Sequence, residues 1–368
     1  MRTSTTPGLV LVHGSNAAAV PFGHESVTHA NLARKLAAIK DMEFGGAFDS
    51  SASYDRPIYL VPSDTLTTEE AHTQFGVRVE NDIFGGVVPH AFAATKTITH
   101  CLPEASSLAP VGWSPEFCQS VCGVVLPGYS AFTARDALIG GLRLLKGGVI
   151  RLKLAEGIGG SGQWLIKDAG ELGARLQLLE TEGRLRKGLV LERNLNDATT
   201  LSVGQVIVDN LVATYYGTQR EVVNNHGHRV YGGSKLTVVR GGCSELLALD
   251  LPANVRSGIE QAWAYDTAAR VCFRGSFMSR RNYDIAQGVD DAGEWRSGVL
   301  EQSWRVGGAS GAEVAALEAF KSDPALQLVR ASTTELYGHD VVVPGGAFTY
   351  FSGVDERVGA LTKYSQID

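Results

Sequence analysis

The chain contains a glycine-rich loop between two extended segments, with the sequence Gly157-Ile158-Gly159-Gly160-Ser161-Gly162. Residues 149–154 alternate polar and apolar side chains as a strand does, and residues 163–167 also favour an extended strand. This order predicts a hairpin whose tip can fold over phosphate oxygens, because glycines let backbone N–H groups approach a ligand closely. A plain flexible turn is the alternative.

The loop also matches the dinucleotide-binding pattern G-x-G-x-x-G. A dinucleotide site needs a helix that begins inside this pattern, so that the helix N-terminus meets the pyrophosphate. Here the next helix is expected only over residues 169–182, after a capping box of Asp168 and Glu171. An NAD-dependent dehydrogenase is therefore a weaker alternative.

Two acidic residues lie on a second expected hairpin. Asp291-Ala292-Gly293-Glu294 is a good turn sequence, and a hairpin symmetric about Ala292–Gly293 pairs Asp284 with Glu301. Like charges directly opposite each other destabilise a sheet. A Mg²⁺ ion that also binds nucleotide phosphates would resolve the conflict. A slip in register, or two solvated carboxylates, is the alternative.

The residues that follow Glu301 extend this candidate site. Ser303 and Arg305 would point the same way as Glu301 on an extended strand. The Arg305 guanidinium could stabilise the charge that develops as a γ-phosphoryl group moves. Lys153, before the glycine loop, would likewise complement phosphate charge. A surface position is the simpler interpretation of either residue taken alone.

The order of these motifs resembles the ATP-grasp superfamily, over roughly residues 90–310. A segment around Lys96 precedes the strand of Lys153, the glycine loop, and the short strand Leu189-Val190-Leu191-Glu192. A late pair of strands then carries D…E-x-[N/S]-x-R. Residues 87–97 and 300–310 are similar to an uncharacterised bacterial ATP-grasp family of unknown function.

The resemblance implies a mixed α/β (α+β) ATP-grasp fold in three parts. An N-terminal α/β domain would span residues 1–90. A central subdomain over 91–187 would carry the glycine-rich hairpin, and a C-terminal subdomain over 188–368 would carry the metal site. The two subdomains would clamp ATP between them.

The resemblance also assigns roles to individual residues. Those expected to contact ATP are Lys96, Lys153, Gly159, Gly160, Ser161, Gly162, Leu191 through its backbone, and Glu192 near the ribose. Those expected to bind Mg²⁺ are Asp284, Glu301 and Ser303, with Arg305 contacting phosphate. Two positions depart from the family pattern: Ser303 replaces the usual asparagine, and Asn282 replaces an arginine, with Arg281 one position away.

These features predict an ATP-dependent ligase. A small carboxylate would attack the γ-phosphorus in line, and an amine, or less readily a thiol, would displace phosphate from the acyl phosphate. Candidate substrate contacts are Tyr216, Arg220 and Arg281, for which structural roles are the alternative. A non-catalytic ATP-binding protein is a further alternative, favoured by Ser303. An α/β-hydrolase lacks its G-x-S-x-G elbow here.

The amino-acid composition limits the kinds of partner that we expect for this protein. The formal net charge of -6 gives no basic footprint for nucleic acid, and no apolar run has the length of a membrane span. The five cysteines form no CxxC pair, so we expect them to be reduced and the protein to be cytoplasmic. A homodimer is expected only because dimers are the commonest soluble oligomer.

Overall fold

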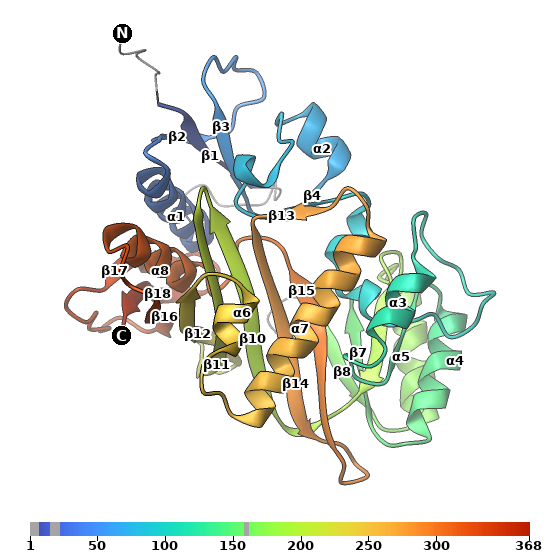
Figure 1. Cartoon of the computed structure of the whole chain (residues 1–368). Helices are drawn as coiled ribbons and strands as arrows, with labels where there is room; N and C mark the ends of the chain where they lie inside the picture. Colours follow the sequence, from blue (N-terminus) through green and yellow to red (C-terminus); the bar gives the residue numbers. More distant parts are fainter. Residues whose placement is uncertain (1–6, 15–22, 158–161) are drawn as a thin grey trace.

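The structure is a computed structural model that describes residues 7–14, 23–157 and 162–368. Figure 1 shows a small parallel sheet at the N-terminus, a large antiparallel sheet, and a compact four-stranded sheet beside it. The longest helix of the described chain has 20 residues and carries several charges. Within the described residues, no helix is long and apolar enough to cross a membrane.

The N-terminal sheet has the strand order β2-β1-β3, with all strands parallel. Its elements are β1 (Leu9–His13), α1 (His24–Lys40), β2 (Glu43–Ala47) and β3 (Ile58–Pro62). Helix α1 buries Leu32 and Leu36, which lie four residues apart on one face. A linking segment follows, with β4 (Leu66–Thr67), α2 (Thr68–Thr73), η1 (Glu80–Asp82), β5 (Gly86–Val88), η2 (Ala91–Ala94), η3 (Lys96–Thr99) and α3 (Pro115–Val121).

The four-stranded sheet has the order β6-β9-β7-β8. Its elements are β6 (Gly128–Ala131), α4 (Ala134–Leu145), β7 (Ile150–Leu154), β8 (Gln163–Ile166), α5 (Ala169–Thr181) and β9 (Leu189–Arg193). Strands β7 and β8 are an antiparallel hairpin, so the strands predicted on both sides of the glycine loop are confirmed. Because β9 belongs to this sheet, the sheet continues past the subdomain boundary expected at residue 187.

The large sheet has the order β15-β14-β10-β11-β12-β16-β18-β17. Its strands are β10 (Asn196–Val208), β11 (Leu211–Val223), β12 (Arg229–Arg240), β14 (Arg280–Val289), β15 (Trp295–Ser303), β16 (Leu328–Tyr337), β17 (Phe348–Asp355) and β18 (Gly359–Ile367). Helices α6 (Cys243–Leu247) and α7 (Ala253–Cys272) follow β12, and α8 (Ser310–Ser322) follows β15. A short strand, β13 (Phe277–Met278), pairs with β5 and ties the sheet to the N-terminal part.

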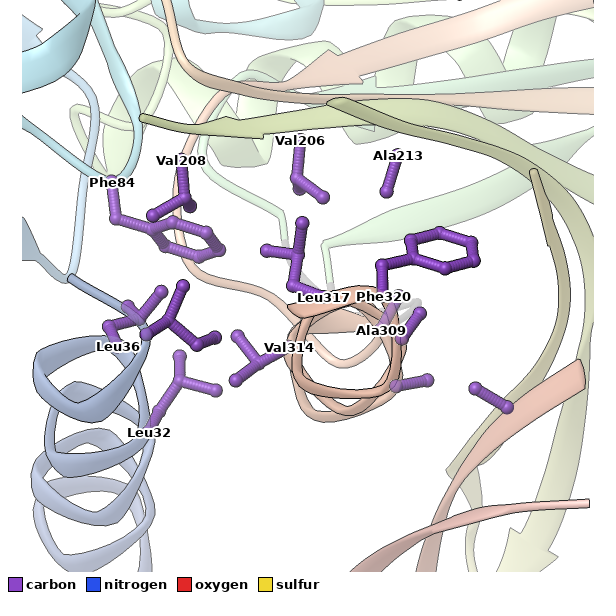
Figure 2. Close-up of a cluster of buried hydrophobic side chains, with 14 of the residues drawn as sticks. Leu32, Leu36, Phe84, Val206, Val208, Ala213, Ala309, Val314, Leu317 and Phe320 are labelled. Carbon is purple, nitrogen blue, oxygen red and sulfur yellow. The ribbon is translucent and has the colours of Figure 1, made fainter. Parts of the chain in front are cut away.

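The two faces of the large sheet are covered by different helices. Helix α7 packs on one face, where Ile259 and Tyr265 meet Tyr283 and Ile285 of β14. Helix α8 lies on the other face and sits between that face and α1 (Figure 2). In that cluster, Leu36 of α1 is buried with Val314 and Leu317 of α8 and with residues of β10. One hydrophobic core therefore joins the N-terminal helix to the C-terminal sheet.

The hairpin of β14 and β15 has a turn that differs from the predicted one. Near the turn, the pairing of the two strands is symmetric about Ala292. The predicted centre of symmetry lay between Ala292 and Gly293. A β-bulge then leaves Leu300 unpaired, and Asp284 pairs with Glu301. The predicted pairing of these carboxylates is confirmed, although it depends on a bulge that the sequence pattern did not indicate.

The bulge also sends neighbouring side chains to opposite faces. Val299 and Glu301 are two residues apart, so they would share a face on a regular strand. With Leu300 inserted between the paired positions, Val299 is buried in the α7 cluster while Glu301 faces away from it with Asp284. Residues 299–301 therefore contribute to both the hydrophobic core under α7 and the candidate site.

The cysteines differ from the expectation. Cys101 and Cys118 form a disulfide, with their Cα atoms 5.1 Å apart. They meet because α3 packs against η3, a contact with no local sequence signal. The expectation that all five cysteines are reduced is therefore wrong for this pair, while Cys122, Cys243 and Cys272 are free thiols.

Candidate functional site

Polar side chains gather on the sheet faces that α7 and the α4–α5 pair do not cover. On the four-stranded sheet, α4 and α5 pack on one face, and Lys153 and Glu192 lie on the other. On the large sheet, the face opposite α7 carries Ser202, Gln219 and Asp284. The segment η3 contacts β15 of the large sheet and β6 and β9 of the smaller one. Residues of η3, of the large sheet and of the four-stranded sheet therefore meet at this segment.

Asp284 and Glu301 face each other across β14 and β15. Oδ1 of Asp284 accepts three hydrogen bonds, from Ser202 Oγ at 2.9 Å, Gln219 Nε2 at 3.0 Å and Asn282 Nδ2 at 3.1 Å. Burial, and then the neighbouring charge of Glu301, raise the pKa of Asp284, and these hydrogen bonds oppose the rise. The pair thus repels as the sequence predicts, and a cation would relieve the repulsion.

Lys96 connects this pair to the glycine hairpin. Its Nζ atom lies 2.9 Å from Oε2 of Glu301 and donates a 2.7 Å hydrogen bond to the carbonyl oxygen of Gly157. The Lys96 side chain is 3% exposed, whereas that of Glu301 is 37% exposed. A buried ammonium therefore sits between the entrance of the glycine loop and the carboxylate pair, where it can meet phosphate oxygens.

Lys153 is paired with Glu192 in a buried cluster. The Nε2 atom of His100 lies 3.5 Å from Oε2 of the same carboxylate. Burial opposes ionisation of Glu192, but the charge of Lys153, and after it the neighbouring His100, outweigh burial and lower the pKa to about 2. Glu192 is only 2% exposed and forms a buried ion pair with Lys153, and its predicted position near a ribose stays a prediction.

Asp284 and Glu301 offer two carboxylates to a metal ion. Within residues 7–14, 23–157 and 162–368, no group of three or more His, Cys, Asp or Glu residues could hold a metal. Mg²⁺ typically takes one or two carboxylates and completes its shell with phosphate oxygens and water. Asp284 and Glu301 together match that requirement.

A family model described as a protein of unknown function (DUF3182) matches residues 11–365. The chain belongs to the DUF3182 family. None of the curated proteins compared with it by sequence matches. The activity of this DUF3182 protein therefore has to be inferred from its fold and its site.

Solved structures place the DUF3182 chain in a known fold. Phosphoribosylamine–glycine ligase from Thermotoga maritima superposes with a TM-score of 0.54 at 15% identity, over 98% of this chain and 92% of that one. Biotin carboxylase from Campylobacter jejuni gives 0.51 at 11%, over 98% and 87%. N5-carboxyaminoimidazole synthase from Aspergillus clavatus gives 0.51 at 12%, over 99% and 94%. These likenesses confirm the predicted ATP-grasp fold and its mixed α/β class.

Three predicted substrate contacts lie away from the carboxylates in this DUF3182 protein. Tyr216 pairs with Val203 and packs against the α7 cluster. Arg281 contacts Asp266 of α7, with its Nε atom at 3.7 Å, and Arg220 pairs with Gly233 and donates to the carbonyl of Gly232. Because side chains alternate along a strand, all three belong to the face opposite Asp284. We leave them out of the substrate site.

The predicted contacts of Leu191 with ATP and of Arg305 with phosphate stay predictions. Leu191 lies in the middle of strand β9, which has a neighbouring strand on each side. It pairs with Tyr129 of β6 and with Leu152 of β7, so its backbone takes part in the sheet pairing. Among the described residues, the polar contacts of the Arg305 side chain are the carbonyl of Val306 at 2.9 Å and the carboxylate of Asp64 at 4.0 Å. Arg305 thus lies toward the N-terminal sheet.

The glycine loop is described only at its two ends. Gly159, Gly160 and Ser161 lie outside the described residues. Gly162 has a φ of +66°, and its carbonyl accepts a 3.0 Å hydrogen bond from the backbone of Leu154. The positive φ favours glycine at the closing position of the hairpin.

Five residues that support the site are not predicted from the sequence. They are His100, Ser202, Gln219, Arg280 and Glu313. Each acts through a partner far along the chain, as Ser202 does with Asp284, 82 residues later. Only the alternation of β10 and β14 could have indicated this contact, and it required the strand pairing to be known.

Proposed function

We propose that this protein is an ATP-dependent ligase that phosphorylates a small carboxylate and couples it to an amine. The observation that carries this proposal is the facing pair of Asp284 and Glu301, with Lys96 held between Glu301 and the glycine hairpin. Support comes from the fold, which is also found in a phosphoribosylamine–glycine ligase and in a biotin carboxylase solved as a beta-gamma-ATP complex. Because the reaction consumes ATP, we place it in the cytoplasm.

In the proposed reaction, Asp284 and Glu301 would hold Mg²⁺, which when bound would neutralise charge on the phosphate tail. Lys96 and Lys153 orient phosphate oxygens from the two sides of the site. Glu192 keeps Lys153 extended, since their ion pair is buried. The protein contributes mainly position and electrostatic stabilisation, as is general in phosphoryl transfer.

The substrate carboxylate attacks the γ-phosphorus and expels ADP, which forms an acyl phosphate. The amine then attacks the carbonyl carbon, the bond to phosphate breaks, and the nitrogen loses a proton. Arg305 is the candidate for binding either the transferred phosphoryl group or the substrate carboxylate, since it follows Ser303 at the end of β15 and also faces Asp64.

A screen for ADP release tests the proposal. The purified protein is incubated with ATP, Mg²⁺ and mixtures of amino acids and other small carboxylic acids, with and without amines. We expect ADP release that requires Mg²⁺ and one acid, and that stops in Glu301→Gln. ATP binding without ADP release under any mixture would instead favour a non-catalytic nucleotide-binding protein.

A further inference from the structure

The oxygens of Asp284 and Glu301 are unequally occupied. Oδ1 of Asp284 takes all three of its hydrogen bonds, from Ser202, Gln219 and Asn282. Oε2 of Glu301 is the oxygen that faces Lys96. Among the described residues, Oδ2 of Asp284 and Oε1 of Glu301 accept no hydrogen bond. One oxygen of each carboxylate therefore remains for a cation.

Ser303, the other candidate metal ligand, lies beside a buried cation. Nη1 of Arg280 donates to the carbonyl oxygen of Ser303 at 2.9 Å and to its Oγ atom at 3.3 Å. Arg280 is 1% exposed, and a guanidinium does not lose its proton in a protein. A divalent ion on Oγ of Ser303 would thus lie next to a permanent positive charge.

The Arg280 guanidinium is also fixed in place. Its Nε and Nη2 atoms donate to the two carboxylate oxygens of Glu313 at 3.0 Å and 2.8 Å, and Glu313 is fully buried at the start of α8. Movement of Arg280 away from Ser303 would leave Glu313 charged, buried and unpaired, which is strongly unfavourable. The cation beside Ser303 is therefore a built part of the site.

We propose that this protein binds its nucleotide with a single divalent ion, held by Asp284 and Glu301, and that Arg280 occupies the place of a second ion. Many phosphoryl-transfer sites use two ions, so the number is a specific property of this site. The ion belongs to the hard cations, such as Mg²⁺ or Mn²⁺, which prefer carboxylate and phosphate oxygens. This inference rests on the proposed function.

Counting bound Mn²⁺ tests the inference without any turnover. The full chain is saturated with a non-hydrolysable ATP analogue and titrated with Mn²⁺, and free Mn²⁺ is followed by electron paramagnetic resonance. We expect one Mn²⁺ per chain. Two ions per chain would overturn the inference while leaving the proposed function intact, whereas no binding of Mn²⁺ or of the analogue would remove both.

Two variants assign the ion to its ligands. Ser303→Ala keeps the carbonyl that Arg280 binds, so we expect an unchanged count and an unchanged Kd for Mn²⁺. Glu301→Gln should weaken Mn²⁺ binding by about tenfold or more, because it removes one of the two charges that hold the ion. A loss of Mn²⁺ affinity in Ser303→Ala equal to that in Glu301→Gln would make Ser303 a ligand and contradict the inference.

Discussion

At the scale of single residues, buried charges decide how the site is held. Lys153 and Glu192 are both nearly inaccessible, and His100 is 3% exposed beside them. A pair of this kind rarely adds stability over apolar residues of similar size, but removal of one partner leaves the other charge buried and unpaired. We interpret the ion pair as a means of orienting Lys153. We expect the pair to make the free energy of unfolding depend on pH.

The acid stability of the protein should depend on Glu192. Its pKa falls from 4.5 in the unfolded chain to about 2, so its contribution is full above pH 4.5 and is lost as the pH falls toward 2. The free energy of unfolding of the wild type should therefore drop by about 3 kcal/mol more between about pH 6 and about pH 2 than that of Lys153→Met/Glu192→Gln. Urea denaturation at each pH measures the difference.

An exposed pair supplies the matched control. Lys187 and Glu156 also form an ion pair, but their side chains are 67% and 65% exposed. Water screens such a pair, so Glu156→Gln should leave the pH dependence of the wild type unchanged. Equal slopes for the wild type and the double variant would contradict the role given to Glu192.

At the scale of elements, the position of η3 depends on a close approach to β6. A Cβ atom on Gly128 would come within 2.6 Å of the His100 ring, although its backbone conformation is ordinary. Gly128→Ala should therefore displace His100 and lower the free energy of unfolding by about 1–3 kcal/mol. Chemical denaturation gives the value.

Gly123→Ala is the control for this substitution. Apart from Gly123 and its two chain neighbours, no atom of the described chain lies within 4 Å of a Cβ atom placed there, so its stability should stay close to that of the wild type. Equal stability of Gly128→Ala and Gly123→Ala would show that η3 is not held by the contact between β6 and His100.

The sequence predicts elements better than their contacts. The strands around the glycine loop and the pairing of Asp284 with Glu301 follow from alternation and turn residues, which are local signals. The bulge at Leu300 has no such signal, because it places Val299 in a core formed by a distant helix. The contact of Glu192 with Lys153 and that of Arg281 with α7 also depend on long-range packing.

At the scale of the whole molecule, one hydrophobic cluster joins the first helix to the last. Leu36 of α1 and Leu317 of α8 are both fully buried in it (Figure 2). Leu36→Ala should therefore cost about 2–5 kcal/mol and lower the unfolding midpoint of the C-terminal sheet as well. Tryptophan fluorescence is a suitable probe, because all five tryptophans lie beyond residue 90.

The control for this prediction is Leu138→Ala on α4, where the residue is 38% exposed against 0% for Leu36, so less buried apolar area is lost. We expect its fluorescence midpoint to stay near that of the wild type. A Leu36→Ala variant whose tryptophan transition is unchanged would mean that the N-terminal part unfolds by itself.

The binding of a non-hydrolysable ATP analogue tests the central claim most directly. Isothermal titration calorimetry compares the wild type with Glu301→Gln, each with and without Mg²⁺. If Asp284 and Glu301 hold the metal of the nucleotide, the wild type binds the analogue in a Mg²⁺-dependent manner, and Glu301→Gln binds it about tenfold more weakly or worse. Equal affinity in the two proteins, or affinity in the wild type that ignores Mg²⁺, would contradict the account.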